Sequence, residues 1–86
     1  TTDMLNISDA YIGAHYGALT DKAREAIRLV AHLEGIFLDP VYSGKGMSGL
    51  IDQIRSGEIG PDETVVFLHT GGIPALFAYD PEVLLA

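Results

Sequence analysis

The sequence contains no cysteine and no tryptophan, and basic residues are few. Without cysteine, neither disulfide bonds nor cysteine-ligated zinc can hold the fold together. Five lysine and arginine residues against twelve acidic ones give a net charge of −7. Such a charge disfavours contact with nucleic-acid phosphates and with an anionic membrane surface. No apolar run approaches the ~18 residues of a membrane span, so we expect neither a nucleic-acid nor a membrane partner.

Metal-ligand spacing and a targeting segment are also missing. The three histidines are scattered along the chain, and no metal site is predicted from them. The opening residues Thr1-Thr2-Asp3 place an acid where a signal peptide carries a basic residue. We therefore expect a cytoplasmic protein.

At 86 residues the chain permits one small domain, yet 48% of its residues are hydrophobic. That share is high for a free-standing domain of this size, whose core would be marginal. The sequence opens without methionine and closes on the apolar stretch 83–86. We interpret residues 1–86 as part of a larger protein.

Two amphipathic helices are predicted from apolar residues at i, i+3, i+4 and i+7. The first begins at Thr20 or Asp21 and ends before Gly35, with an apolar face that Leu29 and Leu33 widen. The second follows a glycine-rich stretch at 43–46 and ends at Gly57. Its predicted apolar face consists of Met47, Leu50, Ile51 and Ile54.

Two strands are predicted between and after these helices. Residues 36–38 form a short apolar run stopped by Asp39-Pro40, and residues 64–69 read as a strand that is buried on both faces. Pro74 is suited to the first turn of a short closing helix that reaches Tyr79. Alternating helices and strands predict an α/β fold with parallel pairing, whose remaining strands belong to other sequence.

Two glycine-containing patterns are candidates for ligand binding. Gly44-x-Gly46-x-x-Gly49 matches a dinucleotide-binding pattern, but Asp39-Pro40 breaks the preceding strand and no acid follows at the required distance. Close approach of a helix explains these glycines more simply. The loop His69-Thr70-Gly71-Gly72 leaves the end of a predicted parallel strand, where ligands gather. Thr70 offers a hydroxyl there and Gly71 a backbone N–H, although an ordinary turn explains the loop equally well.

Two long strings resemble one enzyme family together. They are LEGIFLDPVYSGKGMSGL at 33–50 and FLHTGGIPALFAY at 67–79. Both are similar to the C-terminal region of the pyridoxal-phosphate enzymes that comprise 1-aminocyclopropane-1-carboxylate deaminases, D-cysteine desulfhydrases and L-cysteate sulfo-lyases. The resemblance covers about Asp9 to Tyr79. It implies a tryptophan-synthase-β-like fold (fold type II), in which residues 1–86 are the C-terminal part of the cofactor-binding domain and are incomplete alone.

The resemblance also implies site residues. Tyr42 matches the family's motif tyrosine, assigned acid/base or nucleophilic work, and Tyr16, 26 positions earlier, matches a tyrosine of the substrate pocket. Ser43 and Thr70 stand where the deaminases carry glutamate and leucine, and with Gly71 they are the expected cofactor-binding residues. His15 stands where the deaminases have glutamate and is a candidate partner for an anionic substrate group.

The departures at Ser43 and Thr70 follow the sulfur-eliminating members rather than the deaminases. The resemblance therefore implies a pyridoxal-phosphate-dependent carbon–sulfur lyase acting on a small amino acid, D-cysteine or L-cysteate, with pyruvate, ammonia and sulfide or sulfite as products. The lysine that anchors the cofactor and the phosphate-binding loop are expected upstream, so the segment alone is expected to be inactive. The resemblance also implies that the upstream domains and a second copy of the protein are partners. A deaminase and a non-enzymatic α/β binding module are the alternatives.

Overall fold

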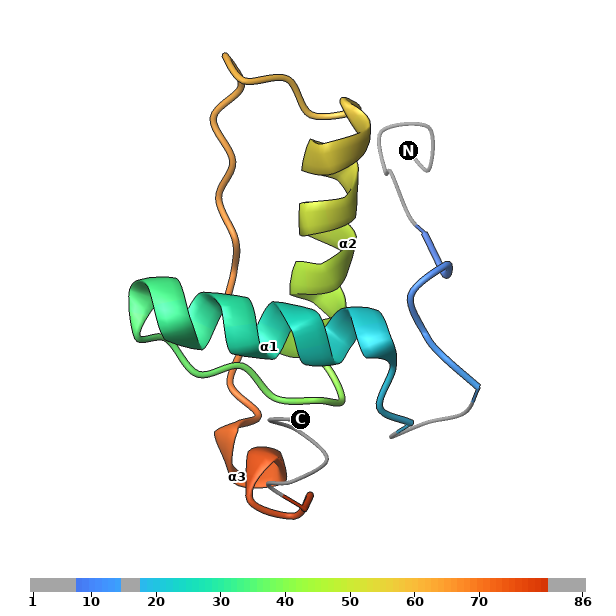
Figure 1. Ribbon diagram of the computed structural model, residues 1–86, viewed down its shortest axis with the longest axis vertical. Coiled ribbons are helices and arrows are strands. Elements are labelled where there is room, and N and C mark those ends of the chain that lie inside the picture. Colours follow the sequence, from blue (N-terminus) through green and yellow to red (C-terminus); the bar gives the residue numbers. More distant parts are fainter. Residues whose placement is uncertain (1–7, 15–17, 81–86) are drawn as a thin grey trace.

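The computed structural model describes residues 8–14 and 18–80. It contains three helices, α1 (Asp21–Glu34), α2 (Ser43–Ser56) and the short α3 (Ile73–Leu76). Helix α1 crosses the N-terminal part of α2, and the chain that leaves α2 runs back past both helices to α3 (Figure 1). No helix among the described residues is long and apolar enough to cross a membrane.

Helix α1 has the ends that the sequence predicts. The Thr20 hydroxyl accepts a hydrogen bond from the Ala23 N–H at 3.0 Å, which satisfies one of the backbone donors at the helix start. At the other end Gly35 has φ 65°, and its N–H donates to the Ala31 carbonyl. This left-handed conformation costs glycine little, which is why the helix stops there. Leu33, predicted to widen the apolar face, is instead 65% exposed.

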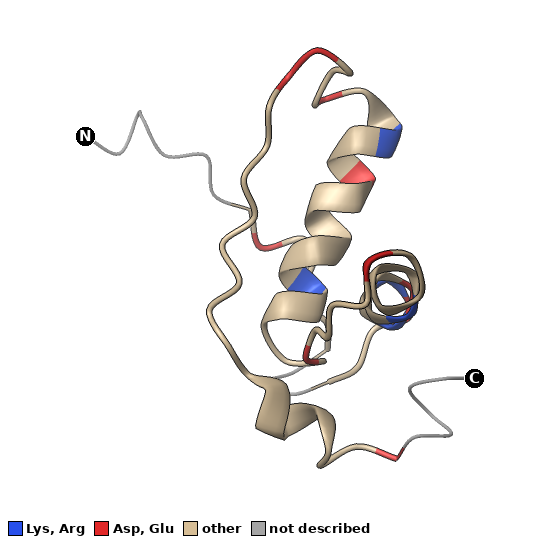
Figure 2. Ribbon diagram, turned by 90° about the vertical axis from the view of Figure 1, so that its left-hand side faces the viewer, with Lys and Arg blue, Asp and Glu red and all other residues tan. Residues whose placement is uncertain are grey.

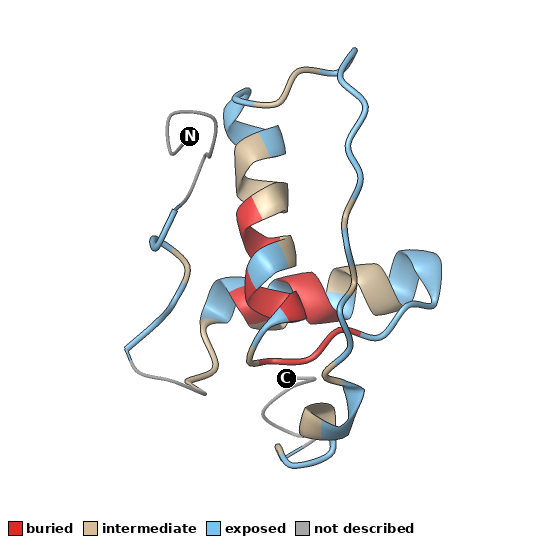
Figure 3. Ribbon diagram, turned by 180° about the vertical axis from the view of Figure 1, so that it is seen from behind, coloured by how far each residue is buried: buried red, intermediate tan, exposed pale blue. Residues whose placement is uncertain are grey.

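The core lies where α1 meets the start of α2 and the segment at 38–40 (Figure 3). Ala23, Ala26, Ile27 and Leu38 are buried there. Partly buried side chains pack around Ile27 and Leu38; they are Leu19, Val30, Met47, Phe67, Leu76 and Tyr79. Residues far apart in the sequence thus share one small core, and its centre lies beside the N-terminus of α2.

Helix α2 buries a different face from the predicted one. Its buried residues are Ser43, Gly44, Lys45, Ser48 and Gly49, whereas Ile54 of the predicted face is 51% exposed. Small residues are selected at this contact because the two helices lie close together. A β-carbon at Gly44 would come within 3.0 Å of Ile27 Cγ1. Of the predicted apolar face, Met47, Leu50 and Ile51 are partly buried and only Ile54 is exposed.

The predicted parallel sheet is not found among the described residues. Residues 36–38 and 64–69 form no strand there. The predicted burial of residues 64–69 on both faces is not seen among the described residues, since Val66 is 88% exposed and Leu68 is 79% exposed. A strand needs neighbours that complete its backbone hydrogen bonds, and no neighbouring strand lies within 8–14 and 18–80. Figure 2 shows the segment from 64 to α3 without a charged residue.

The closing helix is shorter than predicted. It ends at Leu76 instead of Tyr79, with Pro74 in its first turn as expected. Proline suits this position because the first N–H groups of a helix have no partner inside it. The helix follows directly on Gly72 and so keeps the preceding loop close to the core.

Candidate functional site

The start of α2 is organised by a buried aspartate. Asp39 is fully buried, and its carboxylate accepts four hydrogen bonds. Oδ2 accepts from the N–H groups of Val41 and Tyr42, both at 2.8 Å. Oδ1 accepts from the Ser43 N–H at 2.9 Å and from the Ser43 hydroxyl at 2.6 Å. The sequence Asp-Pro favours such a turn, since an aspartate side chain readily binds the backbone two residues on.

Burial alone raises the pKa of the Asp39 carboxyl. The hydrogen bonds from Ser43, Tyr42 and Val41 lower it by more, so the pKa lies below its usual value. Asp39 is therefore ionised at neutral pH although no cation contacts it in the described part of the chain. Its charge is balanced by N–H dipoles at the beginning of α2, where the helix dipole also favours an anion.

Ser43, a predicted cofactor-binding residue, has its hydroxyl turned toward Asp39. The oxygen accepts the Asp39 N–H at 2.8 Å while its proton is donated to Asp39 Oδ1. The residue is only 5% exposed. The hydroxyl thus closes a ring of hydrogen bonds that fixes the first residue of α2.

Tyr42, the predicted catalytic residue, lies directly before α2 and is 59% exposed. Its backbone is held by Asp39, and its side chain borders a mostly apolar cavity of about 560 Å³. Tyr11, Ile12 and Leu50 also line this cavity. The position combines a fixed backbone with an accessible phenol, which is what an acid/base group requires.

Thr70 and Gly71, the other predicted cofactor-binding residues, are exposed in the loop before α3. His69 fixes this loop. The Gly71 N–H donates to His69 Nδ1 at 3.2 Å, so the ring proton is on Nε2, which lies 2.8 Å from the Phe37 carbonyl oxygen and donates to it. His69 thereby connects the loop with the segment that leads into Asp39.

The two loops meet at Asp39. Gly72 has φ 91°, and a β-carbon there would lie 2.5 Å from Asp39 Oδ1 and 2.7 Å from Cγ. Only glycine allows the loop to pack this closely against the carboxylate. The structure thus brings the loop of Thr70 and Gly71 next to the turn that holds Ser43, although the Tyr42 cavity does not extend to that loop.

The remaining predicted site residues, His15 and Tyr16, lie outside the described residues. Within 8–14 and 18–80, no group of three or more histidine, aspartate or glutamate side chains is arranged to hold a metal ion.

The three glycines that match the dinucleotide pattern lie inside α2, so they do not form the strand-to-helix turn of a dinucleotide site. Close packing explains Gly49, because a β-carbon there would lie 3.2 Å from the Tyr11 ring. Gly46 has more room, with only Phe67 ring carbons at 3.7 Å.

Both lysines of the chain are engaged in contacts. Lys45 is 9% exposed, and its Nζ donates to the Ile12 carbonyl at 2.6 Å. Lys22 Nζ lies 3.4 Å from Asp52 Oδ2 and 5.4 Å from the centre of the Tyr11 ring. Lys45 also lines the cavity beside Tyr42, with its Nζ bound to the Ile12 carbonyl. It thereby ties the segment at 8–14 to α2.

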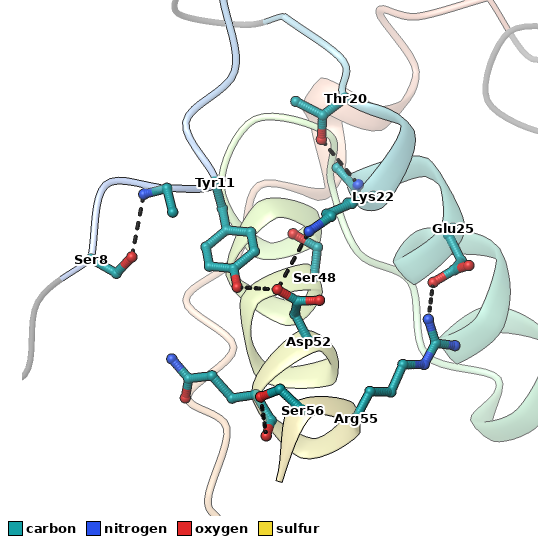
Figure 4. A network of polar contacts seen from close by, with 12 residues as sticks. Ser8, Tyr11, Thr20, Lys22, Glu25, Ser48, Asp52, Arg55 and Ser56 are labelled. Atoms are coloured by element: carbon teal, nitrogen blue, oxygen red, sulfur yellow. Dashed lines mark hydrogen bonds and ion pairs between the residues drawn. The ribbon is translucent and has the colours of Figure 1, made fainter. Parts of the chain in front are cut away.

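Sequence reasoning missed a polar cluster on the outer side of α2. The Tyr11 hydroxyl donates to Asp52 Oδ2 at 2.5 Å, and Lys22 approaches the same oxygen (Figure 4). The hydrogen bond from Tyr11 is the main cause that lowers the pKa of Asp52, and the same bond raises the pKa of Tyr11. Nearby, Arg55 and Glu25 form a second exposed ion pair between α2 and α1. No spacing rule links residues 30 to 41 positions apart, so the sequence carried no signal for it.

The family model and the individual relatives that match the chain agree with each other. A family model described as pyridoxal-phosphate dependent enzyme matches residues 1–71. D-cysteine desulfhydrases of Salmonella typhi and Salmonella newport (strain SL254) are each 49% identical to the chain over 79 residues. The matched region is 92% of this chain and 24% of each relative. The chain thus spans about a quarter of the length of these relatives.

Proposed function

Because the chain belongs to the family of pyridoxal-phosphate dependent enzymes, we propose that it forms the C-terminal part of a pyridoxal-phosphate-dependent carbon–sulfur lyase. Its substrate is D-cysteine or L-cysteate, and the products are pyruvate, ammonia and sulfide or sulfite. The 49% identity to D-cysteine desulfhydrases is the observation that carries this proposal. The anchoring lysine and the phosphate-binding loop belong to the sequence beyond this chain.

The described residues fit one edge of a pyridoxal-phosphate site. Tyr42 is exposed and follows the turn formed by Asp39, and Thr70 is exposed in the loop whose Gly72 packs against the Asp39 carboxylate. When bound, pyridoxal phosphate supplies an electron sink for negative charge at the α-carbon of the substrate. Thr70 and Gly71 hold the ring edge of the cofactor, and Ser43, whose hydroxyl is bound to Asp39, contributes to that edge by fixing the start of α2. Tyr42 lies beside the substrate, where its phenol oxygen takes up or returns a proton.

The preference for elimination rests on the absence of a carboxylate side chain at positions 43 and 70, which are serine and threonine. A carboxylate at this edge, as in the deaminases, would stabilise a protonated ring nitrogen, because opposite charges favour the charged form. Ser43 and Thr70 are neutral and do not favour that protonation. This environment suits rapid loss of a β-sulfur group better than ring opening of a cyclopropane.

The exposed apolar segment at 64–69 supports the larger fold. Val66 and Leu68 are among the most exposed large apolar residues in the described part of the chain, and no charged residue lies between 64 and 69. Such a segment is suited to a parallel sheet whose other strands come from the upstream domains. We include in the proposal the fold type II architecture, a homo-oligomeric enzyme and a cytoplasmic location.

The reaction is tested on the full-length enzyme loaded with pyridoxal phosphate. It is incubated in turn with D-cysteine, L-cysteate and 1-aminocyclopropane-1-carboxylate, and pyruvate and 2-oxobutanoate are quantified. We expect pyruvate from at least one of the first two substrates. Formation of 2-oxobutanoate from the third, with no pyruvate from the others, would identify a deaminase instead.

The role of Tyr42 is tested by Tyr42→Phe, with Tyr79→Phe as the matched control. Both changes remove one phenol oxygen, but Tyr79 packs beside the core. We expect kcat to fall by about 100-fold or more in the Tyr42 variant, the typical contribution of a positioned acid or base. Equal kcat values for the two variants would remove Tyr42 from the proposal.

His15 is proposed to contact the anionic group of the substrate. A protonated imidazole can pair with a sulfonate. His15→Gln is then expected to raise KM for L-cysteate more than KM for D-cysteine, which carries no sulfonate. Unchanged KM values for both substrates would show that His15 has no such role.

A further inference from the structure

Asp39 has a place in the site that neither the sequence nor the resemblance assigned to it. We propose that Asp39 is a positioning residue, whose carboxylate sets the backbone of Tyr42 and Ser43 on one side and the Thr70–Gly72 loop on the other. The inference rests on the proposed function, since it is through these two loops that the chain meets the cofactor. Asp39 itself is fully buried and acts only through its neighbours.

The first support is the way in which the carboxylate is satisfied. Each of its oxygens accepts two donors, three of them backbone N–H groups of consecutive residues. The Asp39 carbonyl oxygen accepts a further N–H from Gly44 at 2.7 Å. No neutral side chain of the same size can accept from all four donors, because an asparagine would turn an NH₂ group toward two of them. The turn at 39–43 therefore requires a carboxylate.

The second support is the contact with Gly72. The loop packs so closely on the carboxylate that a β-carbon would have to displace Asp39 Oδ1 or the loop itself. Gly57 provides a comparison, because its φ of 86° matches the 91° of Gly72 while a β-carbon there would meet nothing within 4 Å. Backbone strain is thus equal at the two glycines, and only Gly72 presses on Asp39.

A shared support of this kind would fix the distance between the groups that hold the cofactor. Misplacement of a binding group by about 1 Å can cost about 100-fold in rate, so precise support matters at this edge. Asp39 can provide it because a buried, fully hydrogen-bonded carboxylate has little freedom to move.

The first experiment measures cofactor affinity in the full-length protein. Asp39→Ser is compared with Asp52→Ser, which removes the same charge from the exposed side of α2. The apo forms are titrated with pyridoxal phosphate, and the dissociation constant is taken from the absorbance change. We expect the constant to rise about tenfold or more for Asp39→Ser and to stay within about twofold for Asp52→Ser. Equal constants would overturn the inference.

The second experiment uses the glycines and holds even where Asp39→Ser fails to fold. Gly72→Ala is expected to weaken cofactor binding about fivefold or more, and Gly57→Ala to leave it within about twofold. Similar constants for the two variants would mean that strain alone acts, which overturns the inference.

A double variant separates action through Asp39 from direct contact of Gly72 with the cofactor. If the new methyl group acts through the carboxylate, Gly72→Ala adds little once Asp39 is shortened to serine. The double variant should then bind the cofactor within about twofold of Asp39→Ser alone. Fully additive losses would overturn the inference. Failure of the wild-type protein to bind pyridoxal phosphate would overturn the proposed function as well, and so marks a different failure.

Discussion

A methyl group added at Gly44 tests the geometry at the start of α2. A β-carbon there would lie 2.5 Å from the Asp39 carbonyl oxygen and 3.0 Å from Ile27 Cγ1. Since real β-carbons essentially never approach closer than 3.0 Å, either the helix or the turn must move by about half an ångström. Gly46 is the matched control, because it lies in the same helix and its added methyl group would meet only ring carbons at 3.7 Å.

The two substitutions are expected to change the free energy of unfolding in opposite directions. Alanine is more favourable than glycine inside a helix by about 0.5–1 kcal/mol, and Gly46→Ala should gain that amount. Overpacking at a tight contact costs about 1–3 kcal/mol. Displacing the Gly44 N–H from the Asp39 carbonyl costs about 0.5–1.5 kcal/mol more. We therefore expect Gly44→Ala to destabilise the start of α2 by about 1–3 kcal/mol in spite of its better helix propensity.

Hydrogen exchange in the full-length protein measures this effect locally. Amide protection in the peptide that covers residues 40–50 should fall about tenfold for each 1.4 kcal/mol lost in Gly44→Ala, and should rise slightly in Gly46→Ala. Equal or increased protection in both variants would show that the Asp39 carbonyl does not lie against Gly44. The reasoning about the turn at 39–43 would then be refuted.

Three further predictions concern charge and exposed apolar surface. Tyr11→Phe should raise the pKa of Asp52 toward its ordinary value, because the Tyr11 hydrogen bond is the main cause of the lowering; carbon-13 NMR titration of the carboxyl checks this, and an unchanged pKa contradicts it. Asp39 has a lowered pKa, so its contribution to stability is present above the unfolded value of about 3.9 and is lost as the pH falls through the folded value. Unfolding measured between about pH 5 and pH 2 should thus depend less on pH in Asp39→Ser than in the wild type, and equal slopes would refute the assignment. Val66→Asp in the full-length enzyme should lower the melting temperature sharply although Val66 is 88% exposed here, because the proposed sheet buries it; a melting temperature like that of the wild type would exclude residue 66 from a buried strand.

The features that were predicted correctly are those that depend on residues close together in the sequence. The ends of α1 follow from Thr20 and Gly35, whose effects reach only a few residues along the chain. The buried face of α2 was predicted wrongly because apolar periodicity does not show which face a neighbouring helix will choose. In this chain α1 packs closely on Gly44, so the small residues at the start of α2 are the most buried, and Met47 of the predicted face is partly buried in the same core.

The site shows the same division between local and distant effects. Asp39 was expected to stop the apolar run at 36–38, and its bonds to Val41, Tyr42 and Ser43 are local. Its contact with Gly72, 33 positions later, could not be predicted from the pattern because it depends on how the chain returns after α2. The resemblance supplied the identity of the candidate residues, whereas their mutual support is visible only in three dimensions.

The burial of Lys45 has a practical consequence for labelling. The chain has two lysines, and amine-reactive dyes or cross-linkers modify those whose amino group reaches the solvent. The Lys22 side chain is 62% exposed on α1, whereas Lys45 is 9% exposed and its Nζ is bound to the Ile12 carbonyl. Within the described part of the chain, α1 therefore carries one addressable amine at Lys22. A fluorophore or a surface tether could be attached there without modifying a residue of the turn that Asp39 holds.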